Sequence, residues 1–267
     1  MDFWNTKNGS ARISSGQMDY VVFGKGMDCL VMIPGLGDGF HTVRGLAAAL
    51  AVTYRMYAKN YKVYMFSRKN HLEKGYSTKD MARDTAEAME MLGITRAKVL
   101  GVSQGGMIAQ HLAADYPYLV EKLVLAVTLA KADEMTKKVL EHWIRLAEQE
   151  DYKTLMIDTA EKTYTEKYLR KYRLLYPLLG MMGRRKDFRR FLIQAESCLW
   201  HDSSEELWKI MCPVLVIGGG KDKIAGRDAS VRIAEKIRDS ELYIYEELGH
   251  GAYEEAKDFH YRIMRFF

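Results

Sequence analysis

The sequence predicts an α/β fold in which a mostly parallel sheet carries helices on both faces. Three observations predict it. Apolar strand-like runs alternate with helix-like stretches, the alternation stops once in the second half of the chain, and it then resumes to the C-terminus. Parallel strands need such helical crossovers, which bury both faces of the sheet. The 267 residues and a hydrophobic content of 48% suit one large core with an insertion.

The first half of the chain begins with strands and then alternates. Residues 11–15 and 18–23 form an expected hairpin that turns at Gly16 and Gln17, and residues 29–33 form a fully apolar strand. The elements expected after it are helix 42–58, strand 63–66, helix 78–92, strand 99–102, helix 106–116 and strand 123–127.

The second half contains the interruption. From residue 131 to residue 205 the strand pattern disappears, and helical segments are expected at 139–148, 164–175 and 188–199. The alternation resumes with strand 214–217, helix 229–237, strand 242–245 and a closing helix, 253–267. We therefore assign residues 1–130 and 206–267 to the core and residues 131–205 to an inserted helical cap. Such an insertion would lie over the carboxyl ends of the strands, where open parallel sheets bind ligands.

The composition excludes several classes of protein. The 40 basic and 35 acidic side chains give a net charge of +5, which does not indicate a nucleic-acid partner. Cys29, Cys198 and Cys212 are too few for a disulfide framework and lack the paired spacing of a zinc site, which favours a reducing compartment. Neither a signal peptide nor a membrane span is expected, so we predict a cytoplasmic protein. No pattern indicates an oligomeric state.

The segment 101–105, Gly-Val-Ser-Gln-Gly, lies between an expected strand and an expected helix. Glycines two residues before and two residues after Ser103 permit a turn so sharp that the serine backbone is strained and its hydroxyl projects from the sheet. This arrangement is typical of a nucleophile.

A serine hydroxyl becomes a good nucleophile when an imidazole takes its proton and a carboxylate orients that imidazole. Of the seven histidines, His250 alone directly follows an expected strand and is flanked by glycines. Asp222 follows another strand, on a glycine-rich loop, so both residues lie at carboxyl ends of strands, as Ser103 does. Asp133, after the strand that ends at Val127, is a rival for the acid.

The order Ser103, Asp222, His250, the G-x-S-x-G motif and the alternating elements together resemble the α/β-hydrolase superfamily, in its branch of capped serine esterases, lipases and lactonases. The resemblance covers nearly the whole chain and implies an α/β-hydrolase fold whose chemistry needs no cofactor and no metal. The family most often takes its acid from the strand position of Asp222, which favours Asp222 over Asp133.

The resemblance also implies an oxyanion hole made by two backbone amides. One is the amide of Gln104, directly after the nucleophile, and the other is the amide of Leu36, in the loop after strand 29–33. Pro34 stands where the family usually has histidine. This departure bears on a supporting hydrogen bond but leaves the amide of Leu36 in place.

Together these residues predict a serine hydrolase that cleaves carboxylic esters of a small, apolar substrate through an acyl-enzyme. Relatives with the same triad cleave lactones, thioesters, amides or carbon-carbon bonds or perform perhydrolysis, and the triad does not separate these activities. A serine at position 103, where epoxide hydrolases and haloalkane dehalogenases have aspartate, argues against those two reactions. A non-catalytic small-molecule receptor on the same fold is the alternative from another class.

Other conspicuous residues receive structural interpretations. His41 and His71 are expected at the surface near the site, and His111 in helix packing or at the surface. The apolar run 174–183 suits either a pocket roof or the core of the cap. The basic run 167–190 suits a solvated helix face, and the alternative is a binding site for an anionic substrate or partner.

Overall fold

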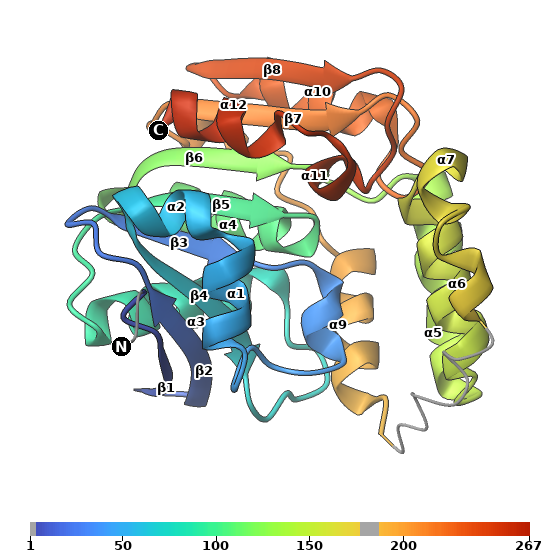
Figure 1. The fold of residues 1–267 in the computed structure, drawn as a ribbon, viewed down its shortest axis with the longest axis horizontal. Helices are drawn as coiled ribbons and strands as arrows, with labels where there is room; N and C mark the ends of the chain where they lie inside the picture. Colours follow the sequence, from blue (N-terminus) through green and yellow to red (C-terminus); the bar gives the residue numbers. More distant parts are fainter. Residues whose placement is uncertain (1–3, 177–186) are drawn as a thin grey trace.

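A computed structural model describes residues 4–176 and 187–267 of the chain. Its centre is an eight-stranded sheet with the order β1-β2-β4-β3-β5-β6-β7-β8 (Figure 1). The strands are β1 (Lys7–Ile13), β2 (Gly16–Phe23), β3 (Cys29–Ile33), β4 (Lys62–Lys69), β5 (Ala97–Val102), β6 (Val120–Ala126), β7 (Val214–Gly219) and β8 (Ser240–Tyr245). β2 pairs antiparallel with β1 and β4, and all other neighbours are parallel. The predicted α/β class with a mostly parallel sheet is confirmed.

Helices cover both faces of this sheet (Figure 1). One face carries α1 (Ala47–Thr53), α2 (Arg55–Asn60) and α12 (Phe259–Phe266), and the other carries α3 (Thr78–Met91), α4 (Gln104–Asp115) and α10 (Arg227–Lys236). In β3, Leu30 and Met32 join the first apolar layer, whereas Val31 and Ile33 join the second. Because successive side chains of a strand point to opposite faces, a strand buried on both sides must be apolar throughout.

A helical segment leaves the sheet after β6 and returns before β7 (Figure 1). Its described helices include α5 (Glu134–Glu148), α6 (Tyr152–Thr163), α7 (Glu166–Leu169) and α9 (Arg189–Leu199). An isolated β-bridge and an ion pair of 2.7 Å join Lys131 to Asp202, so the two ends of the segment lie side by side. α5, α6 and α7 stand beyond the carboxyl ends of the parallel strands.

The helical segment has an apolar core of its own that continues into the site. Leu140 and Trp143 of α5 and Phe191 of α9 cluster with Met107 of α4 and with Ile224, which follows β7. The segment is therefore packed against the loops that leave the sheet rather than merely tethered to them.

Several expected element boundaries were wrong. The first hairpin turns at Ser14 and Ser15, because Gly16 and Gln17 already pair within β2. Helix 42–58 begins later and is interrupted at Tyr54, whose non-helical backbone separates α1 from α2. The closing helix is likewise divided, into α11 (Ala252–Glu255) and α12, by the extended residue Ala256.

The helical segment departs furthest from the expectation. Residues 164–175 contain only the short α7 and a 3-10 turn (Arg173–Leu175), whereas α6 was not predicted. α6 buries Leu155 and Thr163 alone, so it lacks the apolar stripe that marks an amphipathic helix in a sequence. Most of the apolar run 174–183 lies outside the described residues.

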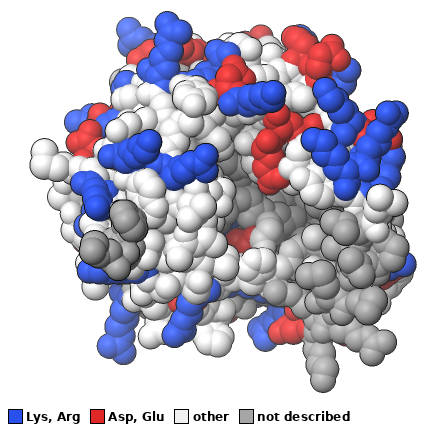
Figure 2. All heavy atoms as spheres, viewed as in Figure 1, with Lys and Arg blue, Asp and Glu red and all other residues white. Residues whose placement is uncertain are grey.

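Charges of both signs lie on the face of the molecule that Figure 2 shows. Figure 2 shows Lys and Arg interspersed with Asp and Glu on the visible face, around a hollow near its centre. No helix in the described ranges combines the length and apolar character needed to cross a membrane.

Candidate active site

Ser103 occupies a strained corner between β5 and α4. Its backbone has φ 54° and ψ −120°, a conformation that costs an L-residue about 1 to 3 kcal/mol. The corner is held on both sides, because the Ser103 amide donates to the carbonyl of Ala126 at 2.9 Å and the Ser103 carbonyl accepts from the hydroxyl of Thr128 at 2.8 Å. The hydroxyl of Ser103 is thereby fixed at the carboxyl edge of the sheet.

The two glycines of the motif provide space. A Cβ on Gly101 would lie 2.5 Å from the carbonyl oxygen of Gly105, and a Cβ on Gly105 would lie 1.9 Å from that of Ile33. Neither glycine has a positive φ. The positive φ belongs to Ser103 itself, and the glycines allow the backbone of α4 to approach β5 and the loop after β3.

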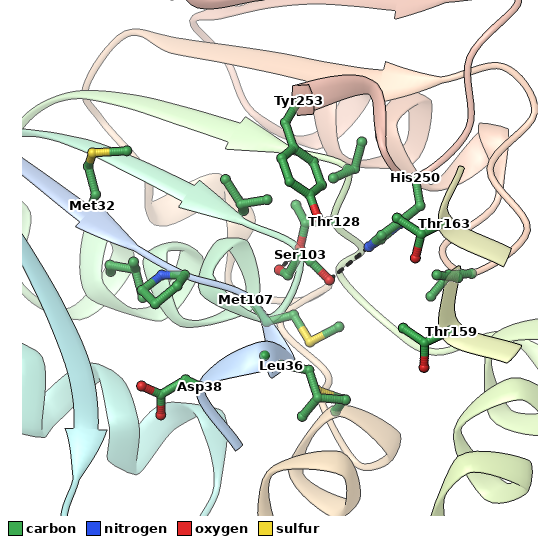
Figure 3. Close-up of a pocket in the computed structure, with 18 of the residues that line it drawn as sticks. Met32, Leu36, Asp38, Ser103, Met107, Thr128, Thr159, Thr163, His250 and Tyr253 are labelled. Atoms are coloured by element: carbon green, nitrogen blue, oxygen red, sulfur yellow. Dashed lines mark hydrogen bonds between the residues drawn. The ribbon is translucent and has the colours of Figure 1, made fainter. Parts of the chain in front are cut away.

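His250 and Asp222 form a hydrogen-bonded chain with this serine, and Figure 3 shows its first link, from Ser103 to His250. The Oγ of Ser103 lies 2.9 Å from Nε2 of His250, and Nδ1 of His250 lies 2.8 Å from Oδ2 of Asp222. His250 and Asp222 are both buried, whereas Ser103 borders a cavity. The structure thus brings together three residues that are far apart in the sequence.

Two loops carry His250 and Asp222 and pack backbone against backbone. A Cβ on Gly219 would lie 2.3 Å from the carbonyl oxygen of Gly249, and the amide of Lys221 donates to the carbonyl of Leu248 at 2.8 Å. Gly219, the last residue of β7, is therefore required for close approach, which brings the loop of Asp222 against the loop of His250.

The surroundings of Asp222 keep its carboxylate ionised. Burial by itself raises the pKa of Asp222, but the charge and hydrogen bond of His250 and the amides of Ile224 and Ala225 outweigh burial and lower the pKa. Oδ1 accepts from these two amides at 2.8 and 2.9 Å. Because an ionised carboxylate only accepts, Nδ1 of His250 donates to it, and Nε2 is left to accept the proton of Ser103.

Two backbone amides are available beside the hydroxyl. Leu36 and Gln104 are the first residues of a 3-10 helix (Leu36–Gly39) and of α4, and neither helix has a side-chain N-cap. Amides at this position have no acceptor inside their own helix. A Cβ on Gly35 would lie 3.3 Å from Cβ of Ser103, so the loop that carries Leu36 packs directly on the serine.

A cavity of about 390 Å³ opens at Ser103 and extends to both sides of it (Figure 3). One arm runs towards Met32 and is apolar, and Leu50, Met65 and Leu100, which also line the cavity, belong to the same apolar cluster as Met32. The other arm runs under α6, where it is lined by Thr159 and Thr163. Its size and mainly apolar wall are those of a small-molecule site.

The model of the alpha/beta hydrolase fold family matches residues 28–257 of the chain. The chain belongs to the α/β-hydrolase family. Its relatives include a 2-hydroxy-6-oxononadienedioate/2-hydroxy-6-oxononatrienedioate hydrolase of Burkholderia vietnamiensis, which is 26% identical over 91% of this chain and 88% of the relative. Membership in this family, together with relatives named as hydrolases, identifies the protein as a hydrolase.

Solved structures agree on the fold. An enol-lactonase from Burkholderia xenovorans superposes with a TM-score of 0.82 at 20% identity, covering 97% of this chain and 99% of the other. An esterase from Exiguobacterium antarcticum superposes with a TM-score of 0.78 at 20% identity, with the same two coverages.

The rival and discarded residues of this α/β-hydrolase lie in different surroundings. Asp133 caps α5 by accepting from the amide of Thr136 and does not contact His250 in the described structure. His41 is exposed but does line the cavity, and His71 is exposed away from it. His111 is buried and bonds to Glu206, as expected for a packing role.

Among the described residues, one group has the chemistry to hold a metal ion. Ligand atoms of His111, Asp115 and Glu206 lie within 4.8 Å of one another. The ammonium of Lys79 lies 2.7 Å from Glu206 and 3.4 Å from Asp115 and already neutralises these carboxylates. None of the four residues lines the cavity at Ser103, so we assign them a structural role.

Two arginines beside the site were not predicted from the sequence. Arg190 belongs to the basic run that was expected to form a solvated face, but it forms an ion pair of 2.6 Å with the buried carboxylate of Asp38. Arg68, the largest fully buried side chain, contacts Pro34 and Gln104. The available signal was a basic pair, Arg68 and Lys69, at the carboxyl end of β4, at the same edge of the sheet as Ser103.

Proposed function

We propose that the protein hydrolyses carboxylic esters whose acyl group is small, uncharged and apolar, and that the reaction passes through an acyl-enzyme. Ser103 is the nucleophile, His250 the general base and then acid, and Asp222 the residue that orients the imidazole. The amides of Leu36 and Gln104 stabilise the oxyanion. The observation that carries the proposal is the hydrogen-bonded chain Ser103–His250–Asp222 at the mouth of a mainly apolar cavity.

In the first half of the reaction, Oγ of Ser103 attacks the ester carbonyl while its proton passes to Nε2 of His250. The carbonyl oxygen becomes an oxyanion, which the two amides stabilise by donating hydrogen bonds to it. The tetrahedral intermediate collapses, the bond to the alcohol oxygen breaks, and the proton on Nε2 goes to the departing alkoxide. The products of this half are the acyl-enzyme and the alcohol.

In the second half, His250 takes a proton from water and the resulting hydroxide attacks the acyl carbon. Collapse of this second intermediate returns the proton to Oγ of Ser103 and releases the acid. Asp222 remains ionised throughout and stabilises the imidazolium in both halves. The three side chains and two amides thus account for every proton in the reaction.

The cavity wall favours an uncharged acyl group over a dianion. The name of the Burkholderia vietnamiensis relative specifies a dioate, which carries two carboxylates. A buried carboxylate needs a cationic or hydrogen-bonding partner. No Lys or Arg is among the described residues that line this cavity, and the carboxylate of Asp38, which also lines it, is already paired with Arg190. This supports cleavage of a neutral ester rather than the carbon-carbon cleavage of such a dioate.

The two arms suit the two halves of an ester. We assign the acyl chain to the apolar arm lined by Met32, Leu50 and Met65, and the alcohol to the arm lined by Thr159 and Thr163, whose hydroxyls can bond an oxygen. The helical segment 131–205 would then act as a cap, since α5 and α6 supply the wall of the second arm.

The first experiment compares hydrolysis of p-nitrophenyl acetate, butyrate and octanoate by the wild type and by Ser103→Ala. We expect Ser103→Ala to lose roughly 10⁴- to 10⁶-fold in kcat. Equal rates would refute the proposal. A matched pair, p-nitrophenyl valerate and the p-nitrophenyl monoester of glutaric acid, tests the charge preference. We expect kcat/KM to be at least about tenfold higher for the neutral ester, in line with the cost of burying an unpaired carboxylate.

A fluorophosphonate probe separates this function from that of a non-catalytic receptor. Labelling requires an activated serine, so we expect it in the wild type and not in Ser103→Ala. A wild type that resists labelling at high probe concentration would favour the receptor.

A further inference from the structure

Arg68 lies in β4 with 1% of its surface exposed. Burying a guanidinium is costly, and burial lowers the pKa of Arg68 even though the neighbouring Asp38 opposes the change. Its Nε and Nη1 have no hydrogen-bond partner among the described residues. A buried charge whose donors are used so incompletely calls for an explanation other than stability.

Of the three guanidinium nitrogens of Arg68, only Nη2 has partners among the described residues, and it bridges the two halves of the oxyanion site. Nη2 donates to the carbonyl oxygen of Pro34 at 2.6 Å and to Oε1 of Gln104 at 2.7 Å. Pro34 lies two residues before Leu36, and Gln104 supplies the other amide itself. A single side-chain atom is thus bonded to both segments whose amides the proposed function assigns to the oxyanion hole.

The loop after β3 and the turn at Ser103 follow two neighbouring strands, in which Ile33 pairs with Gly101. They pack backbone on backbone, since a Cβ on Gly105 would lie 2.8 Å from the carbonyl oxygen of Pro34. Gly35 and Gly105 contribute no side chain to interlock. Proline at position 34 offers its carbonyl as an acceptor but has no amide hydrogen to donate.

The far ends of both segments are held by α9. Arg190 bonds the carboxylate and the carbonyl of Asp38, at 2.6 and 2.9 Å, and the amide group of the Gln104 side chain donates to the carbonyl of Gln194 at 2.9 Å and to Oγ of Ser197 at 3.1 Å. With Arg68 between them, these bonds enclose both oxyanion segments in one network.

We propose that Arg68 is a positioning residue of the oxyanion hole: its guanidinium fixes the Pro34 carbonyl and the Gln104 side chain so that the amides of Leu36 and Gln104 converge on one point. The inference rests on the proposed function, because that function assigns the two amides to the oxyanion. Arg68 does not touch the substrate, since it does not line the cavity. Its effect must therefore appear in stabilisation of the transition state and not in substrate binding.

The test is steady-state kinetics of Arg68→Met, which keeps the length of the stem and removes the donors. Loss of an oxyanion donor costs about 10²- to 10³-fold, so a misplaced donor is expected to lower kcat by roughly 10- to 100-fold while KM stays within about twofold. The affinity of an alkyl boronic acid, whose tetrahedral adduct places an oxygen at the oxyanion position, is expected to fall by the same factor as kcat/KM.

Lys98→Met is the matched control. Lys98 is also buried and also lies on a central strand, but it pairs with Asp28 and Glu121, away from the site. This variant is expected to lose stability and to keep kcat. If Arg68→Met does not fold, Arg68→Lys decides. Its ammonium is carried on a stem one atom shorter than that of Nη2, so it does not reach both acceptors at the same distances, and we expect a loss of about tenfold in kcat.

Gln104→Met and the double variant Arg68→Met/Gln104→Met complete the design. If Arg68 and the Gln104 side chain together position the same two amides, the double variant is expected to lose much less kcat than the product of the two single losses. A folded Arg68→Met or Arg68→Lys with wild-type kcat and boronate affinity would overturn this inference alone, provided that Ser103→Ala is inactive. Wild-type turnover by Ser103→Ala would overturn the proposed function and this inference with it.

Discussion

The amide of Gly251 donates a hydrogen bond of 2.6 Å to the carbonyl of Thr163. Gly251 directly follows His250, and Thr163 is the last residue of α6 and lines the cavity. The loop that carries the imidazole is therefore bonded to the helix that forms the far wall of the site. Movement of α6 is coupled through this bond to the position of the base.

This contact predicts that Gly251→Ala is harmful although φ at Gly251 is ordinary. The new methyl group would lie 2.5 Å from Cδ1 of Tyr164 and 3.0 Å from the carbonyl oxygen of Thr163. Displacement of the His250 loop by a fraction of an ångström is expected to lower kcat/KM roughly 10- to 100-fold. Ester hydrolysis measures it. Tyr164→Ala alone should stay close to wild type, and adding it to Gly251→Ala should restore part of the loss. A fully active Gly251→Ala would show that the position of His250 does not depend on its contact with the end of α6.

The identity of the carboxylate that orients His250 is tested by replacing each of the two candidate aspartates with asparagine. Asp222→Asn is expected to lower kcat by about 10⁴-fold, because the amide stabilises neither the imidazolium nor the required tautomer. Asp133→Asn is expected to stay within twofold of wild type, since asparagine caps α5 as well as aspartate does. Parallel kinetics on one ester decide between them. The reverse ranking would make Asp133 the acid.

The assignment of the acyl arm is tested on α1. Leu50→Trp fills the apolar arm, so activity on p-nitrophenyl octanoate should fall at least about tenfold relative to the acetate. Val52→Trp is the control, because Val52 lies on the same helix with 59% of its surface exposed and does not line the cavity. The ratio of kcat/KM for octanoate and acetate is the readout. An unchanged ratio in Leu50→Trp would assign the acyl chain to the other arm.

Acid sensitivity of the fold is predicted at His201. Burial, reinforced by the neighbouring His111, lowers the pKa of His201 to about 3. Its pKa in the unfolded chain is about 6.5, so below that pH the unfolded state binds a proton that the native state does not. The stabilisation is complete above about pH 6.5 and decreases as the pH falls towards 3, by at most about 1.4 kcal/mol per pH unit.

The variant His201→Asn isolates this contribution, because asparagine can keep the hydrogen bond to the hydroxyl of Thr78 and does not titrate. Urea unfolding at pH 7, 6 and 5 should show the free energy of unfolding falling more steeply in the wild type, by about 1 to 2 kcal/mol between pH 6.5 and 5. Parallel pH dependences for the two proteins would mean that His201 is accessible to protons in the native state.

Local sequence patterns were sufficient to predict the sheet and the strand-to-helix turn at Ser103. β3 and β7 are apolar throughout because both of their faces are buried, and that property is written in consecutive residues. The serine corner was equally visible, because it needs glycines at fixed short spacing. The helical segment was predicted less well, since α6 packs through few buried residues and presents no periodic apolar stripe.

By itself the sequence determined the α/β class and the pattern of Ser103, Asp222 and His250, because strand burial and strand-end loops leave local signals. Only the tertiary structure decided which charged groups serve the site. It placed Asp133 at a helix cap, paired Arg190 with Asp38, and buried Arg68 between Pro34 and Gln104. These partners are 30 or more residues apart, apart from the local cap, and the energy of a buried charge depends on what surrounds it in space, which no neighbouring residue in the chain reveals.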